Sequence, residues 1–409
     1  MLLNFRFKST YFFSFILLIL LLSCSEAKKS SVKPKKATVA TKKLVTGANQ
    51  PKQYLQLLQK KNFAVVANQT SRLQVNGKDV HLVDFLHEKF PTQLKKVFAP
   101  EHGFRGTSDA GEHIKNQVDT KTNLPIISLY GKNKKPNKEQ LKEVELVVFD
   151  IQDVGVRFYT YISTLHYVME ACAENNIPLL VLDRPNPNAH YIDGPVLEKE
   201  QQSFVGMHSV PLVYGMTIGE YAKMINDEKW LKNGVECNLT VIPLQHYSHT
   251  VKYNLPVKPS PNLPNAKAIN LYPSLAFFEG TNVSCGRGTE KQFQLFGSPF
   301  LPKEKYPFTF IPKPNFGAKH PKHEGKICYG KNLENTAYLF KINLQWLLDA
   351  YQDTKNKSTF FIPFFNKLAG TKKMQEQIKN GLSEKEIRAS WEKGIDSFKI
   401  IRNRYLLYE

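Results

Sequence analysis

The sequence predicts an α/β protein: a Rossmann-like parallel sheet domain, followed by a smaller mixed α+β domain. Short, continuous apolar runs alternate with helical patterns, as expected for strands that helices cover on both faces. Several of these runs stop at a cluster of polar residues, and open α/β sheets bind ligands at the carboxyl ends of their strands. We therefore expect an active-site cleft at that edge, between the two domains.

The strands and helices follow from the spacing of apolar residues along the chain. Continuous apolar runs predict strands over 63–67, 94–99, 124–130, 146–149 and 177–182. Amphipathic spacing predicts helices over 52–60, 80–90 and 159–175. Beyond about residue 206 the strands are shorter and more aromatic, and helices are expected over 216–228, 344–354 and 383–405, the last opened by a capping box. We place the two domains at 51–205 and 206–409.

The N-terminus resembles an export signal. Arg6 and Lys8 precede an apolar run over 11–22 that is too short to span a membrane. Leu21-Leu22-Ser23-Cys24 has the form of a bacterial lipobox, so we expect a signal peptide over 1–23 and lipidation of Cys24. The alternative is a free cysteine at the end of an ordinary signal. Residues 24–50 are rich in Lys, Ser, Thr and Pro, which predicts a flexible tether and a lipid-anchored protein that faces the periplasm.

Charge, cysteines and missing motifs exclude several classes of function. The formal net charge is +20, but ten of the Lys and Arg residues lie within the first 52, against one acid. The remaining excess suits an anionic polymer or membrane surface, and no nucleic-acid motif accompanies it. No dinucleotide, P-loop or metalloprotease motif is present, so we expect no cofactor and no metal. Four further cysteines lack metal-site spacing, and disulfides and buried thiols are both open: Cys172, Cys237, Cys285 and Cys328.

Glu101 is the candidate catalytic residue. It lies between Pro100 and His102, directly after a predicted strand, in the stretch VFAPEHGFRG. A glycosidase needs a carboxylic acid that protonates the leaving oxygen, and a partly buried strand-end loop suits that role. The structural alternative is that Glu101 caps a helix or pairs with Arg105. His102 either orients the acid or contacts the sugar, and a purely structural hydrogen bond is as plausible.

The other polar clusters supply candidates for a second catalytic group and for sugar binding. Asp150 and Asp153 precede Arg157, which we expect to pair with them, either at the site or only to fix the loop. Glu279 and Arg287 lie in a Gly-rich loop of the second half that could close the cleft. The second catalytic or stabilising group is therefore sought among Asp150, Asp153 and Glu279. The candidate substrate-binding residues are His102, Arg105, Glu112, Arg157, Tyr159, Arg184, Asn186 and Arg287.

Five stretches together resemble the signature blocks of the bacterial exo-β-N-acetylmuramidase (NamZ-type) family: FAPEHGFRG, DAGEH, DIQDVGVRFYTYISTL, LDRPNPN and FEGTNVSCGRGT. The resemblance covers roughly 53–409. It implies a two-domain enzyme that releases terminal N-acetylmuramic acid from the non-reducing ends of peptidoglycan glycans without a metal. It also implies that the catalytic glutamate lies in the Pro-Glu-His-Gly motif, which in this sequence contains Glu101.

Three hypotheses follow, and they differ in the chemistry they require. The first is a lipid-anchored exo-muramidase, with Glu101 as general acid and either a carboxylate or the substrate's own N-acetyl oxygen as the second group. The second is a non-catalytic cell-wall glycan-binding lipoprotein. The third, an esterase or amidase, lacks a nucleophile in a suitable context. N-acetylmuramic acid carries a lactyl carboxylate, so we expect one arginine to pair with it: Arg105, Arg157, Arg184 or Arg287.

Overall fold

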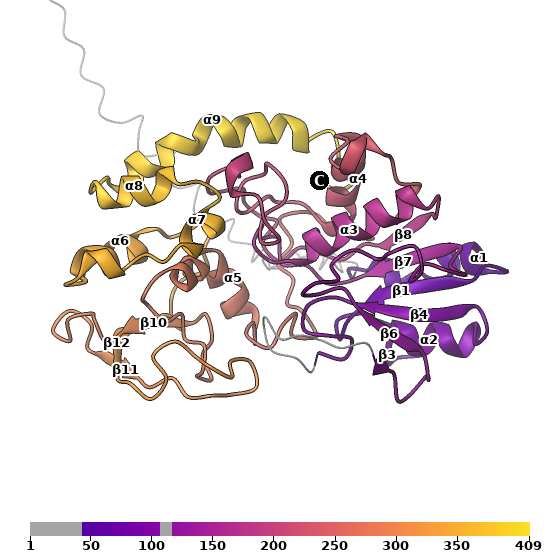
Figure 1. Ribbon diagram of the computed structural model, residues 1–409, viewed down its shortest axis with the longest axis horizontal. Helices are drawn as coiled ribbons and strands as arrows, with labels where there is room; N and C mark the ends of the chain where they lie inside the picture. Colours follow the sequence, from indigo (N-terminus) through magenta and orange to yellow (C-terminus); the bar gives the residue numbers. More distant parts are fainter. Residues whose placement is uncertain (1–42, 107–116) are drawn as a thin grey trace, which may run out of the picture. The chain divides into compact units, whose positions relative to one another are not determined.

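The structure is a computed structural model and describes residues 43–106 and 117–409. A seven-stranded sheet of order β5-β6-β4-β1-β7-β8-β9 organises the first part of the chain (Figure 1). All its neighbouring strands are parallel except β5 and β6, which are antiparallel. The predicted α/β class is confirmed. The strands are β1 (Phe63–Ala67), β4 (Leu94–Ala99), β5 (Gln117–Val118), β6 (Pro125–Ser128), β7 (Leu146–Asp150), β8 (Leu179–Leu182) and β9 (Leu239–Ile242).

Helices cover both faces of this sheet, which explains why its strands are continuous apolar runs. Alternate residues of β1 belong to different cores: Val65 packs with the side of α1 and α2, and Val66 packs with the side of α3 and α4. The strands predicted over 63–67 and 94–99 have the expected bounds. The helices are α1 (Pro51–Leu58), α2 (Leu82–Lys89), α3 (Tyr161–Glu174) and α4 (Ile218–Asp227).

A short hairpin that the sequence analysis did not predict precedes α2, and its last two residues take the place of the first two of the helix predicted over 80–90. Its strands are β2 (Arg72–Val75) and β3 (Lys78–His81), joined by Asn76 and Gly77, both with positive φ. Asn-Gly favours this tight turn because both residues tolerate a left-handed backbone. The helix then begins at Leu82 because the His81 side chain accepts a hydrogen bond from the Val83 amide.

The second part of the chain has its own three-stranded antiparallel sheet, of order β10-β12-β11. As predicted, Ser383 and Glu386 form a capping box that opens the last helix, α9, which begins beside α8 and runs toward α4 (Figure 1). The strands are β10 (Leu295–Ser298), β11 (Phe308–Phe310) and β12 (Cys328–Asn332). The helices are α5 (Ala266–Leu275), η4 (Ala276–Gly280), α6 (Gln345–Asp353), α7 (Phe364–Ala369), α8 (Lys373–Lys379) and α9 (Glu384–Arg402). Four further short 3-10 turns are η1 (Gly47–Asn49), η2 (Lys199–Gln201), η3 (Lys232–Gly234) and η5 (Lys357–Thr359).

The expected divisions of the chain differ from the structure at two places. The boundary expected at 205/206 lies inside the large sheet, because β9 pairs with β8. Residues 43–50, expected to end the tether, instead pack on the sheet: Val45 bridges Gln245, and the Gly47 amide donates to the Asp183 carbonyl at 2.9 Å. Residues 43–409 form one compact unit. The expected signal peptide and Cys24 lie outside the described residues.

All four cysteines in the described part are buried free thiols, which settles the choice left open by the sequence. In that part of the chain, the fold is therefore held by packing, hydrogen bonds and ion pairs rather than by disulfides. Over residues 43–106 and 117–409, no helix combines the length and apolar character needed to cross a membrane.

Arg157 joins segments that are far apart in the sequence. Its side chain is fully buried, and its guanidinium donates at 2.7 Å to the carbonyls of Pro195, Val210 and Ala369. Ala369 ends α7, where carbonyl oxygens without a donor inside the helix favour a cation. Gly370 follows with φ +78°, and a Cβ there would lie 2.3 Å from the guanidinium. The expected pairing of Arg157 with Asp150 or Asp153 is wrong, because main-chain carbonyls take its hydrogen bonds.

Replacing Arg157 with Lys should destabilise the fold although it keeps the charge. One ammonium cannot reach carbonyls on both sides, so buried acceptors lose their donors, and we expect the free energy of unfolding to fall by about 2–4 kcal/mol. Urea denaturation of the variant and the wild type measures the difference. Arg404→Lys, at a side chain that is 55% exposed, is the matched control. A loss no larger than that of the control would contradict the structural role of Arg157.

Candidate active site

A cavity of about 310 Å³ lies beside the end of β4 and is lined by side chains from both parts of the chain. Its wall is largely aromatic, and its polar groups are few and convergent, which is the usual composition of a small-molecule site. The polar lining includes Glu101, His102, Thr160, Asn262, Glu279 and Arg287. The aromatic lining includes Tyr130, Phe158, Tyr159, Tyr161, Phe204, Tyr272, Phe293 and Phe364.

A sharp turn after β4 delivers Glu101 to this cavity. Pro100 cannot donate to a strand ladder, and His102 and Gly103 both have positive φ, 70° and 78°. The Gly103 amide closes the turn by donating to the Pro100 carbonyl at 3.0 Å. The sequence-based placement of Glu101 at a strand end in a cleft therefore agrees with the geometry.

Two hydroxyl groups hold the Glu101 carboxylate. Thr160, just before α3, donates from Oγ1 to Oε2 of Glu101 at 2.7 Å. The Tyr130 hydroxyl, just beyond β6, is also hydrogen-bonded to Glu101. Burial raises the pKa of Tyr130, and the charge of Glu101 raises it further, so the tyrosine stays protonated as a donor. Arg105 forms ion pairs with Asp84 and Asp119 at 3.0 and 2.8 Å.

Glu279 brings a second carboxylate from the other part of the chain. It is the penultimate residue of η4, and Arg287 Nη1 contacts its Oε1 at 2.8 Å. The negative charges of both carboxylates act on Tyr272. Burial raises the pKa of Tyr272 most, and the charges of Glu279 and Glu101 raise it further. A ligand in the cavity would therefore meet two carboxylates, Glu101 and Glu279, and the guanidinium of Arg287.

Tyrosines of the 150–161 stretch fix the wall between the two parts. The hydroxyls of Tyr159 and Tyr161 both donate to the Pro259 carbonyl, at 2.8 and 3.2 Å. Asn68, at the end of β1, donates to the Tyr161 hydroxyl at 2.9 Å. Because Ser260 and Asn262 follow Pro259 into the cavity lining, these bonds tie that segment to the sheet.

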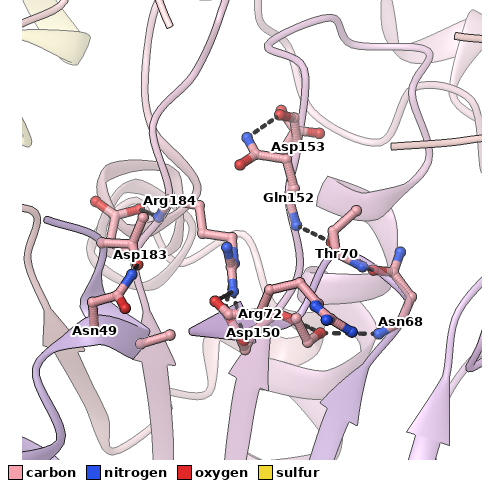
Figure 2. Close-up of polar contacts among 12 residues, drawn as sticks. Asn49, Asn68, Thr70, Arg72, Asp150, Gln152, Asp153, Asp183 and Arg184 are labelled. Atoms are coloured by element: carbon pink, nitrogen blue, oxygen red, sulfur yellow. Dashed lines mark hydrogen bonds and ion pairs between the residues drawn. The ribbon is translucent and has the colours of Figure 1, made fainter. Parts of the chain in front are cut away.

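Asp150 and Arg184 form a buried ion pair (Figure 2), and neither residue lines the cavity. Arg184 meets both oxygens of Asp150, at 2.6 and 2.9 Å, and also donates to the Arg72 carbonyl at 2.9 Å. Burial raises the pKa of Asp150, and the charge of Arg184 opposes that rise. This two-point pairing ties the end of β7 to the end of β8 and the hairpin.

Asp153 and Asn186 are likewise occupied inside the fold. Asp153 accepts hydrogen bonds from the Gly155 amide and the Tyr214 hydroxyl, and burial raises its pKa to about 6. The Asn186 amide donates to the Met216 carbonyl at 2.8 Å. Gly155 has φ +75°, and a Cβ there would lie 2.2 Å from the Asn186 side chain, so this contact requires glycine.

The candidates from sequence therefore separate into two groups. The cavity brings together Glu101, His102, Tyr159, Glu279 and Arg287. Six others do not line it: Arg105, Asp150, Asp153, Arg157, Arg184 and Asn186. Glu112 lies outside the described residues. Within those residues, no group of three or more His, Cys, Asp or Glu side chains is arranged to hold a metal ion.

Several lining residues escaped the sequence analysis. Tyr130 follows a strand end, and the rule that selected Glu101 could have selected it too. Tyr272 lies within α5 and Phe364 begins α7, and no local pattern distinguishes such residues from ordinary core aromatics.

Comparison with known proteins gives matches along nearly the whole chain. Residues 63–267 match the N-terminal domain of the family described as exo-beta-N-acetylmuramidase NamZ, and residues 270–408 match its C-terminal domain. A Bacillus subtilis (strain 168) protein named peptidoglycan beta-N-acetylmuramidase NamZ is 38% identical over 417 residues, covering 97% of this chain and 99% of that protein.

Two crystal structures of DUF1343 family proteins from Bacteroides fragilis share the fold. One has a TM-score of 0.82 and 44% identity, and the other a TM-score of 0.77 and 28% identity. Each match covers 90% of this chain and 99% of the other chain. The arrangement of a parallel sheet followed by a smaller antiparallel one is therefore shared with experimentally determined structures.

Proposed function

The chain belongs to the exo-β-N-acetylmuramidase NamZ family, and from this premise we propose that it removes terminal N-acetylmuramic acid from peptidoglycan glycans with Glu101 as the general acid. Its class as a glycosidase follows from the family. One observation carries the assignment of the acid: Glu101 lines a cavity together with a second carboxylate, Glu279, and the guanidinium of Arg287. Most glycosidases place a pair of carboxylates around the scissile bond, and Arg287 adds a cation for the substrate's own carboxylate.

Glu101 donates its proton to the glycosidic oxygen as the bond to the leaving sugar breaks. Proton transfer needs the acid to be fixed in direction, and the hydrogen bonds from Thr160 and Tyr130 supply that constraint. The aromatic wall excludes water around the sugar, which strengthens the interaction between the carboxylates and the positive charge that develops on the ring.

The second group is either Glu279 or the N-acetyl oxygen of the substrate. Glu279 is the one of the three candidate carboxylates that lines the cavity, whereas Asp150 pairs with Arg184 and Asp153 accepts from Tyr214. Arg287 is likewise the one of the four candidate arginines that lines the cavity, so we assign the lactyl carboxylate to it. Both residues belong to the Glu279–Arg287 ion pair, which would reorganise when the substrate carboxylate arrives.

Glu101→Gln should affect a poor leaving group far more than a good one. With the N-acetylmuramyl-N-acetylglucosamine disaccharide, we expect kcat to fall by about 10²–10⁴-fold, because the sugar alkoxide needs a proton to leave. With the 4-nitrophenyl glycoside of N-acetylmuramic acid, the loss should be much smaller, since nitrophenolate leaves without protonation. Turnover of both substrates is followed by product release and absorbance.

Glu304→Gln, at an exposed glutamate, is the control for the Glu101 variant. Unchanged disaccharide turnover in Glu101→Gln would remove this residue from the role. If the wild type turned over neither substrate but bound the disaccharide, a glycan-binding function would replace the enzymatic one.

Arg287→Gln should weaken the preference for a lactyl group. Losing a charge-assisted contact costs about 1.5–3 kcal/mol, so kcat/KM for the 4-nitrophenyl N-acetylmuraminide should fall by about 10- to 100-fold. The matching N-acetylglucosaminide lacks the carboxylate and should change little, so the ratio of the two kcat/KM values is the measurement. Arg105→Gln serves as the comparison, because Arg105 pairs with Asp84 and Asp119. An unchanged ratio in Arg287→Gln would refute the assignment.

We also propose that the protein is lipid-anchored in the cell envelope, faces the periplasm and acts in cell-wall turnover or recycling. The basic, apolar and lipobox segments that end at Cys24 support this. Cys24→Ala should move the protein from the membrane fraction to the soluble fraction and abolish labelling by radioactive palmitate. Ser25→Ala, at the next residue, should do neither. Palmitate labelling that persists in Cys24→Ala would exclude this cysteine as the anchor.

A further inference from the structure

Phe364 occupies a distinctive place in the cavity lining. Its side chain is 40% exposed, whereas every other lining residue in the described part is buried or half-buried. A residue that both lines a cavity and faces solvent lies at its mouth. Ile362, two residues earlier, is 41% exposed, so the start of α7 forms an apolar lip.

This lip is held firmly against the segment that carries Glu279. The Ile362 amide donates to the Gly280 carbonyl at 3.0 Å, and the Asn282 amide donates to the Phe360 carbonyl at 2.7 Å. A Cβ on Gly280 would lie 2.5 Å from the Cα of Phe365, so α7 approaches η4 as closely as a glycine allows. The backbone that carries Phe364 is therefore fixed relative to the segment that carries Glu279.

The faces of the Phe364 ring differ from those of Phe204, the other partly exposed phenylalanine in the lining. Phe204 stacks on Tyr167, with ring centroids 6.3 Å apart and planes 17° apart, and the Lys134 ammonium lies 4.7 Å from its centroid. No aromatic ring or cation stacks on Phe364 among the residues that the structure describes. Because Phe364 is also 40% exposed, part of its surface is open to a ligand.

The direction of cleavage determines what such a face contacts. This step rests on the proposed function: an exo-acting enzyme holds the terminal sugar inside its cavity, so the rest of the glycan leaves through the mouth. The C–H face of a pyranose is apolar and gains free energy when it covers an aromatic ring, while its hydroxyls stay in water. We propose that Phe364 stacks on the first sugar of the leaving glycan and so selects glycan substrates over isolated glycosides.

Two substrates with the same terminal sugar test this inference. One is the N-acetylmuramyl-N-acetylglucosamine disaccharide, and the other is the β-fluoride of N-acetylmuramic acid, whose leaving group is a single atom. Phe364→Ala should lower kcat/KM for the disaccharide by about tenfold, mainly through KM, because one aromatic contact is lost. The fluoride should change by less than twofold, and Phe364→Tyr should retain disaccharide activity.

Phe340→Ala is the matched control, since Phe340 is 62% exposed and does not line the cavity. It should leave both substrates unaffected. An undiminished kcat/KM of Phe364→Ala for the disaccharide would overturn the inference, and so would an equal loss for disaccharide and fluoride. Failure of the wild type to cleave either substrate would instead overturn the proposed function, and the inference with it.

Discussion

The buried guanidinium of Arg157 is the interaction on which the cavity depends. It donates to carbonyls of the 195–210 segment and to the end of α7, which are more than 150 residues apart in sequence. By holding α7, it also holds Phe364 and Leu368 in the cavity wall. Since α7 packs closely on η4 at Gly280, the position of Glu279 is coupled to the same cation. Leaving this charge without its acceptors would cost several kcal/mol, so this side chain is a principal contact between the two parts of the chain.

The arginines selected from sequence illustrate how one residue type serves different purposes. Arg184 completes a two-point pair with Asp150, and a half-buried Arg105 joins Asp84 to Asp119. In the sequence, Arg105, Arg184 and Arg287 look alike, because each follows a strand or lies in a loop with acids nearby. Only the tertiary structure shows that Arg287 lines the cavity and that the other two do not. A guanidinium donates to main-chain carbonyls as well as to carboxylates, so the neighbouring acids Asp150 and Asp153 were a misleading guide to the partners of Arg157.

The features predicted correctly from the sequence are those that residues close together in the chain determine. The buried strands, the helix capping box at Ser383 and the position of Glu101 after β4 depend on apolar runs, a side-chain cap and a proline within a few residues. The boundary expected at 205/206 separates β9 from β8, although the two strands pair in one sheet. The pairing joins residues sixty positions apart, which no local pattern reports. Tyr272 and Phe364 reach the cavity only through packing between the two parts, and no periodicity within α5 or α7 reports that packing.

The placement of the two cavity carboxylates on different parts has a mechanistic consequence. Glu101 is fixed to the sheet by the turn after β4, and Glu279 is fixed to η4. Their separation is therefore set by the contacts between the parts: the Arg157 carbonyl bonds and the tyrosine bonds to Pro259. In glycosidases a carboxylate separation of roughly 5 Å allows direct attack on the sugar, and one of roughly 6.5–9.5 Å admits a water molecule. Under the proposed function, the interface between the parts decides which of these routes Glu279 could follow, and a wider spacing would leave the N-acetyl oxygen of the substrate as the nearest nucleophile.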